Sequence, residues 1–261
     1  MTAEEVCRLL DWDSAFFGRR IARVIDSQLD SEKMDQVLQF ARAESVECIY
    51  CLVDDGDLKS IRCVEKVGFR CMDVRITREL PMANRPGEEA GQVSDAVGFY
   101  READWKALRA IARSSHGATR FYHDPEFHQE KCDALYERWL ANACANARVD
   151  ENEKVLVVRE GGRAVGYATC ECESTGIGLI GLIAIAEAAR GRGLGELLVR
   201  SVLAWFHKQQ MESVRVISQV RNVESARLYE RLGFVTTATE RWYHLWPELG
   251  QHAEQRVGKR E

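Results

Sequence analysis

The sequence has no excess of positive charge and no apolar run that approaches the roughly 20 residues of a membrane-spanning helix. Its net charge is −5 at pH 7, which argues against a protein that binds nucleic acid through a basic surface. The first residues include Glu4, Glu5 and Asp11 instead of the basic start and apolar core of a secretion signal. We therefore expect a cytoplasmic globular protein with no membrane span and no nucleic-acid partner.

The sequence also lacks the cysteine and histidine spacings of a metal site. It contains nine cysteines, but Cys48 and Cys51 lie in a strand-like segment, where residues three apart point to opposite faces. Cys170 and Cys172 share a strand face, yet no second pair at zinc spacing accompanies them. We expect reduced, buried thiols and no bound metal.

The remaining sequence alternates between strand-like and helix-like segments, which predicts an α/β (α+β) fold. The expected strands are 21–25, 48–53, 71–80, 97–100, 154–159, 163–171, 179–186, 213–220 and 234–245. The expected helices are 31–45 with Ser31 as N-cap, 57–67, 104–114, 127–144, 195–208 and 223–232. Residues 10–18 and 116–125 carry turn-forming residues and are expected to be loops.

A segment rich in proline and glycine interrupts this alternation at residues 81–93, which read P-M-A-N-R-P-G-E-E-A-G-Q-V. Such a segment is typical of a linker between domains. The sequence therefore predicts a domain over 1–80 and a larger one over 94–247. A polar tail over 248–261 is expected to follow.

The two predicted domains share a short internal repeat. S-I-R-C-V-E-K-V-G-F at 60–69 aligns with S-A-R-L-Y-E-R-L-G-F at 225–234, and a predicted strand precedes and follows each copy. The first copy has Val64 where the second has Tyr229. We infer that the first domain is a truncated, degenerate copy of the second without its chemistry. The alternative is a chance recurrence of a common helix–Gly–Phe–strand pattern.

The strongest buried-strand signal, at 179–186, leads into R-G-R-G-L-G at 190–195 and then into a helix with one apolar face. The unpaired N–H groups and the dipole of a helix start favour an anion, and glycine lets a ligand approach the backbone. The spacing G-x-G-x-G does not match the dinucleotide motif G-x-G-x-x-G, and no Gly-Lys-Ser/Thr ending is present. The sequence predicts a different kind of phosphate site, with a ligand-free glycine turn as the alternative.

Arg190, Gly193 and Gly195 fill the fixed positions of R/Q-x-x-G-x-G/A, which resembles the cofactor motif of the GNAT superfamily of acyl-CoA-dependent N-acyltransferases. The stretch N-V-E-S-A-R-L-Y-E-R-L-G-F at 222–234 resembles a second signature of that superfamily. The resemblance implies a C-terminal GNAT fold with a mixed, splayed central sheet and acetyl-CoA as co-substrate. It implies Tyr229 as the general acid that protonates the leaving thiolate. The cofactor-binding residues that it implies are Leu182, Ile183, Ala184, Ile185, Arg190, Gly191, Arg192, Gly193, Leu194, Gly195 and Asn222.

The general base cannot be identified from the sequence. Four side chains are candidates, namely Glu171, Glu173, Glu187 and His123, and each is equally well explained as a solvated or packed residue. An amine of modest pKa needs only a water as proton acceptor.

Further segments resemble one GNAT family, the TDP-fucosamine acetyltransferases. These segments are L-D-W-D-S-A-F-F-G at 10–18, T-R-F-Y-H-D-P-E-F at 119–127 and Y-E-R-W-L at 136–140. The resemblance implies acetylation of the 4-amino group of TDP-4-amino-4,6-dideoxy-D-galactose for surface polysaccharides such as lipopolysaccharide and enterobacterial common antigen. It also implies a homodimer. Residues 119–127 are expected either to line the acceptor side or to form a helix-entry turn.

Two other functions remain open at this stage. One is a GNAT acetyltransferase that acts on another small amine or a protein N-terminus. The other is a non-catalytic acyl-CoA-sensing module, which would keep the glycine turn but would not need Tyr229.

Overall fold

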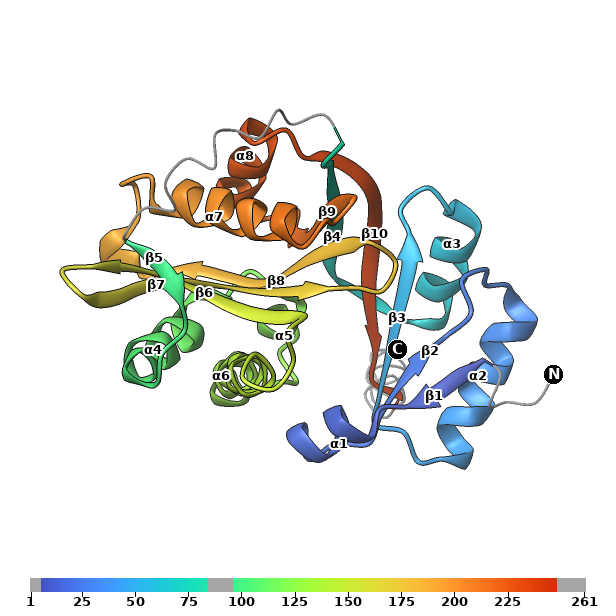
Figure 1. Ribbon diagram of the computed structural model, residues 1–261. Helices are drawn as coiled ribbons and strands as arrows, with labels where there is room; N and C mark the ends of the chain where they lie inside the picture. Colours follow the sequence, from blue (N-terminus) through green and yellow to red (C-terminus); the bar gives the residue numbers. More distant parts are fainter. Residues whose placement is uncertain (1–5, 84–95, 248–261) are drawn as a thin grey trace. The chain divides into compact units, whose positions relative to one another are not determined.

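The computed structural model describes residues 6–83 and 96–247, which form two compact units (Figure 1). The first unit holds residues 6–75, 120–127 and 238–247, and the second holds 76–83, 96–119 and 128–237. Most of the expected linker and the whole expected tail lie outside the described residues, so the predicted domain limits stay a prediction. None of the described helices is long and apolar enough to cross a membrane.

The first unit is a mixed sheet in which the strand order is β1-β2-β3-β10-β4. The β2–β3 pair is parallel, whereas β1–β2 and β3–β10 are antiparallel. Two helices, α2 and α3, pack their apolar faces on one side of this sheet (Figure 1). The strands are β1 (Cys7–Leu9), β2 (Ile21–Val24), β3 (Cys48–Asp54) and parts of β4 (Arg70–Pro81) and β10 (Val235–Leu245). The helices are α1 (Asp11–Phe17), α2 (Ser31–Ala43), α3 (Leu58–Val67) and α5 (Arg120–His123).

Three local predictions for the first unit are wrong. Residues 11–17, in the expected loop over 10–18, form helix α1, which stacks the rings of Trp12 and Phe16 and is capped by Gly18 with φ 68°. The aromatic contact one helical turn apart stabilises a helix too short to show a periodic pattern. The N-cap of α2 is Asp30, which accepts from the Lys33 N–H at 3.0 Å, and not Ser31. The expected loop over 116–125 contains the short helix α5.

The second unit is a sheet covered by helices on both faces (Figure 1). Helices α4 and α6 pack against Val155 and Val157, and α7 packs against Leu156 and Val158, because alternate residues of a strand point to opposite faces. The strands are β5 (Val97–Phe99), β6 (Glu153–Glu160), β7 (Arg163–Cys172), β8 (Ile177–Ile185), β9 (Ser213–Gln219) and part of β4, in the order β5-β6-β7-β8-β9-β4. The helices are α4 (Trp105–Ser115), α6 (Gln129–Asn146), α7 (Leu194–Lys208) and α8 (Val223–Arg231), with 3₁₀ turns at Glu102–Asp104 and Glu187–Ala189.

The sheet of the second unit opens at the carboxyl half of β8. The parallel pairing of β8 with β9 joins Ile177–Ile180 to Ser213–Val216, and β8 continues to Ile185 beyond the last pair. On the other side of β8 the antiparallel register with β7 shifts next to Thr169, whose Oγ1 accepts from the Leu182 N–H at 2.7 Å. The predicted mixed, splayed sheet is confirmed.

The two copies of the internal repeat fold in the same way. Helix α3 follows β3 and precedes β4, and α8 follows β9 and precedes β10. Each helix begins with a side-chain cap 3.1 Å long, from Ser60 N–H to Asp57 and from Ser225 N–H to Asn222. Each is followed by a glycine in the left-handed region, with φ 100° at Gly68 and 87° at Gly233. The inference that the first unit is a degenerate GNAT half stays a prediction.

Gly166 of β7 is a position where only glycine fits. A Cβ there would lie 2.8 Å from the carbonyl oxygen of Ala184 on the neighbouring strand. We expect Gly166→Ala to lower the free energy of unfolding by about 1–3 kcal/mol, because the extra carbon forces the β7–β8 pair apart. Gly117→Ala is the matched control, since a Cβ at Gly117 meets nothing within 4 Å. Urea unfolding of both variants is the measurement, and equal stability would contradict the register described above.

Candidate functional site

The turn between β8 and α7 presents its backbone to open space. Gly191 and Gly193 have φ of 75° and 78°, a conformation that other residues rarely adopt, and a Cβ on either would meet nothing within 4 Å. Gly193 is the N-cap of α7, and no side chain of the described residues caps this helix. The first-turn N–H groups of α7 therefore remain available to an anion.

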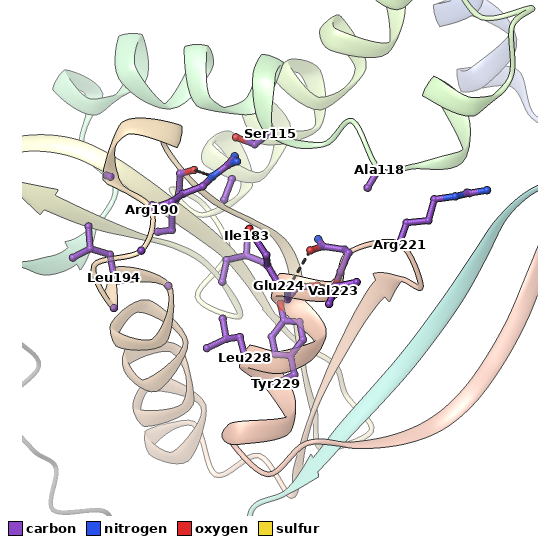
Figure 2. Close-up of a pocket in the computed structure, with 18 residues that line it drawn as sticks. Ser115, Ala118, Ile183, Arg190, Leu194, Arg221, Val223, Glu224, Leu228 and Tyr229 are labelled. Atoms are coloured by element: carbon purple, nitrogen blue, oxygen red, sulfur yellow. Dashed lines mark hydrogen bonds between the residues drawn. The ribbon is translucent and has the colours of Figure 1, made fainter.

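This turn forms one wall of a cavity of about 490 Å³ (Figure 2). The wall opposite the turn comes from α8 and the loop before it, and the floor comes from the end of β8. The predicted cofactor residues that line this cavity are Ile183, Ala184, Ile185, Arg190, Gly191, Gly193, Leu194, Gly195 and Asn222. Its lining also includes Ser115 of α4, whose buried hydroxyl has no hydrogen-bond partner among the described residues.

The two arginines of the turn have different surroundings. Arg190 lines the cavity, and its Nε donates to the carbonyl oxygen of Ile185 at 3.1 Å (Figure 2). Arg192 does not line it, because its guanidinium pairs with Glu160 at 3.0 Å. The positive charge of the cavity beside the glycine turn therefore comes from Arg190.

A second cavity, of about 460 Å³, adjoins the first. The two share Ile183, Asn222, Ser225 and Tyr229 in their linings. The predicted residue Leu182 lines the second cavity and not the first. The other lining residues of the second cavity are His116, Thr119, Tyr136, Trp139, Thr169, Leu179, Ile180, Gly181, Ile217, Ser218 and Gln219.

Tyr229 of α8 lies where the two cavities meet. Its ring is 1% exposed and packs edge-on against Phe234, with 5.3 Å between ring centroids. Figure 2 shows the ring directed toward Ile183 of β8. Its hydroxyl makes no hydrogen bond to any residue of the described chain, and burial raises its pKa. The hydroxyl therefore keeps its proton at neutral pH and is free to donate it.

The charge of a buried arginine partly opposes this effect of burial on the pKa of Tyr229. Arg78 of β4 is 4% exposed, and its positive charge lowers the pKa of Tyr229. Its Nη1 donates to Ser218 Oγ at 2.7 Å, while its Nε has no partner among the described residues. A buried guanidinium without a carboxylate partner favours negative charge in its surroundings. Sequence reasoning missed Arg78, because it lies in a strand that carries no motif.

Asn222 is the N-cap of α8. Its Oδ1 accepts from the Ser225 N–H, and the residue lines both cavities. The capping bond engages the amide oxygen and leaves the NH₂ group available to a ligand. The cap and the expected contact with the cofactor are therefore compatible.

None of the four predicted candidates for the general base lines either cavity. Glu171 lies on β7, Glu173 follows that strand, Glu187 lies in the 3₁₀ turn after β8, and His123 belongs to the first unit. Of residues 119–127, Thr119 lines the second cavity, and the expectation that this segment forms the acceptor side stays a prediction.

The titratable imidazole at the second cavity is His116, which sequence reasoning also missed. Its Nε2 lies 3.0 Å from the Tyr167 hydroxyl, and its ring stacks on Tyr136 at 4.5 Å between centroids. Burial lowers the pKa of His116 to about 4, so the ring is neutral at pH 7. The motif T-R-F-Y-H-D-P-E-F marked the neighbouring segment as a possible acceptor site, but His116 lies three residues before the motif begins.

Comparison with known proteins agrees with this geometry. The profile of the Acetyltransferase (GNAT) family matches residues 105–234, which lie almost wholly in the second unit. A solved structure of a GCN5-related N-acetyltransferase from Sphaerobacter thermophilus superposes with a TM-score of 0.65 at 15% identity, over 92% of this chain and 75% of that chain. At this identity the likeness shows the fold alone.

Two relatives match in sequence. The spore coat polysaccharide biosynthesis protein SpsD of Bacillus subtilis is 26% identical over 156 residues, which cover 58% of this chain and 50% of SpsD. The mycothiol acetyltransferase of Renibacterium salmoninarum is 25% identical over 196 residues, which cover 74% of this chain and 53% of the relative. The chain thus spans about half the length of these two relatives.

The family match covers the glycine turn, the open end of β8 and the tyrosine between the cavities. Residues 105–234 therefore match the GNAT acetyltransferase family, and the second unit has the fold of that family.

Proposed function

We propose that the chain transfers an acetyl group from acetyl-CoA to the amine of an amino sugar. The observation that carries the proposal is the pair of adjoining cavities with Tyr229 between them. One cavity has an anion-binding helix start and the other does not, so donor and acceptor would enter from different sides and meet at the tyrosine.

The first cavity fits acetyl-CoA. The open space above Gly191 and Gly193 is where the pyrophosphate would approach the backbone, and the N–H groups at the start of α7 and Arg190 would hold it. The end of β8, from Leu182 to Ile185, lies beyond the last β8–β9 pair. The backbone groups of this stretch that face away from β7 would bind the pantetheine arm and the carbonyl oxygen of the thioester.

The reaction needs few side chains. The neutral amine attacks the thioester carbonyl, a C–N bond forms, the C–S bond breaks, and the thiolate takes a proton. Tyr229 is the donor of that proton, since burial keeps it protonated and its hydroxyl is not engaged by the protein. The proton lost by the amine passes to a water, because burial disfavours the charged form of His116 at the second cavity.

The second cavity has the character of a sugar site. Its lining contains no Asp, Glu, Lys or Arg among the described residues, but it offers the rings of Tyr136 and Trp139 and several hydroxyl and amide groups. Sugars bind through apolar ring faces on aromatic residues and hydrogen bonds to neutral polar groups. An uncharged cavity also disfavours a protonated amine, which keeps the nucleophile in its reactive form.

The nucleotide-linked amino sugar is the acceptor that we favour. It rests on the resemblance of three sequence segments to TDP-fucosamine acetyltransferases. The name of the relative SpsD, a spore coat polysaccharide biosynthesis protein, is consistent with an acceptor used to build polysaccharide.

The cofactor assignment predicts a specific effect at Gly193. Gly193→Ala should weaken acetyl-CoA binding at least tenfold in calorimetry, because a Cβ would enter the open space above the turn and strain the N-cap. Gly161→Ala in the β6–β7 turn is the matched control, since that glycine also has positive φ and open space. Equal cofactor affinity of the two variants would argue against the glycine turn as the phosphate site.

The role of Tyr229 is tested by removing its hydroxyl alone. Tyr229→Phe should keep acetyl-CoA affinity and the contact with Phe234, and lose about 10²-fold or more in kcat, the usual contribution of a proton donor. Calorimetry and a thiol-release assay give the two readouts. Undiminished turnover would remove Tyr229 from the mechanism.

The acceptor is tested by thiol release from acetyl-CoA with TDP-4-amino-4,6-dideoxy-D-galactose beside a panel of simple amines. We expect turnover with the nucleotide sugar and at least 10²-fold lower kcat/KM with simple amines, since these cannot fill the aromatic cavity. Turnover with simple amines alone would contradict the sugar assignment and leave acetyl transfer in place. Cofactor binding without turnover on any amine would instead favour an acyl-CoA sensor.

A further inference from the structure

One face of the first unit's sheet carries a group of arginines around a tryptophan. Helices α2 and α3 cover the other face, where Ala22, Val24, Tyr243 and Leu245 are buried (Figure 1). Strand alternation therefore directs Arg23 of β2 and Trp242 of β10 to the face opposite these helices. We call Arg23, Arg75, Arg120 and Trp242 the arginine–tryptophan cluster.

The three guanidinium groups of this cluster surround one ring. Their carbon atoms lie 5.1 Å (Arg23), 6.0 Å (Arg75) and 4.2 Å (Arg120) from the centroid of Trp242. Arg8 of β1 stands opposite Arg23 in the β1–β2 pairing and adds a fourth positive charge. All of these residues belong to the first unit, whereas the residues that line the two cavities belong to the second.

Nearby carboxylates do not pair with Arg23. Glu240 pairs with Arg75 at 2.7 Å, and the charge of Asp13 interacts with Arg120. Arg23 itself contacts the Trp242 ring but makes no ion pair or hydrogen bond to any residue of the described chain. It is half-buried, so water compensates its charge only in part.

Arg120 is held in place through His244, which in turn contacts the carboxylate of Asp124. Its Nη1 lies 2.7 Å from His244 Nε2, and His244 Nδ1 lies 2.6 Å from Asp124 Oδ2. Burial lowers the pKa of His244 to about 4, so His244 accepts from Arg120 without carrying a charge. The aromatic rings of Tyr50 and Phe121 flank the same guanidinium at 4.0 Å and 4.2 Å. Arg120 is thus oriented while its positive charge is kept.

The crowding of like charges has an energetic consequence. Burial lowers the pKa of Arg23, and the charges of Arg120, Arg75 and Arg8 lower it further, which means that its neighbours repel its charge. Such repulsion is relieved by an anion, and guanidinium forks are suited to phosphoryl oxygens. The net charge of −5 disfavours a long polyanion as the partner.

We infer that the arginine–tryptophan cluster binds the diphosphate of a nucleotide. The choice of TDP as the probe rests on the proposed function, while the choice of a diphosphate rests on the arginines. The flat Trp242 ring between the guanidinium groups adds an aromatic surface of the kind on which a planar base stacks. Acetyl-CoA also carries a diphosphate, and the test distinguishes binding of acetyl-CoA from binding of TDP.

The test is calorimetric titration of the full chain with TDP while acetyl-CoA is saturating, so that the glycine turn is already occupied. We expect Arg23→Gln to weaken TDP binding about tenfold, since one charge-assisted contact of this kind is worth roughly 1.4 kcal/mol or more. Inorganic pyrophosphate should show the same dependence on Arg23. Arg62→Gln on α3 is the matched control, because Arg62 is exposed and lies outside the cluster, and it should bind TDP as the wild type does.

The outcomes are distinct. Equal TDP affinity in the wild type and Arg23→Gln would overturn the inference. An equal loss of TDP affinity in Arg23→Gln and in the control Arg62→Gln would also overturn it. A tenfold loss of acetyl-CoA affinity in Arg23→Gln would assign the cluster to cofactor phosphates and overturn the assignment to a second nucleotide. Binding is read without turnover, so inactivity of the enzyme would not imitate either result. Thermal melting shows that both variants fold, and Arg23→Gln should melt no lower than the wild type because it removes a repelled charge.

Discussion

The site depends on the point at which β8 stops pairing with β9. Backbone groups inside a sheet are normally consumed by neighbouring strands, but the pairing here ends at Ile180 while the strand runs on to Ile185. The divergence leaves room for two cavities on either side of the strand end. It also leaves backbone donors and acceptors that a thioester and its pantetheine arm can use.

Each other element of the site is arranged around that opening. The chain leaves β8 through a turn whose two left-handed glycines direct N–H groups of α7 into the first cavity. Helix α8 is fixed by the Asn222 cap and places Tyr229 between the cavities. Arg78 supplies a buried positive charge that acts on Tyr229 and has no carboxylate partner in the described chain. The tyrosine is therefore buried enough to stay protonated, yet it lies in a field that favours the anion formed when the proton leaves.

Features that follow from local sequence were predictable, and features that follow from tertiary contact were not. The turn at 190–195 and the helix start at Asn222 are local motifs, so the structure there agrees with the turn and the helix that the sequence predicts. Arg78 and His116 gain their surroundings only when distant strands and helices meet, and no periodic pattern marks them. Helix α1 was missed for a related reason, since seven residues are too few to show a helical period.

A crystal structure with acetyl-CoA bound is the measurement that tests the central claim most directly. The account predicts the pyrophosphate on the N–H groups of residues 191–195, and the thioester carbonyl beside the backbone of Leu182–Ile185. It also predicts the sulfur within hydrogen-bond reach of the Tyr229 hydroxyl. A cofactor whose thioester lies away from Tyr229, or whose pyrophosphate avoids the glycine turn, would contradict the account.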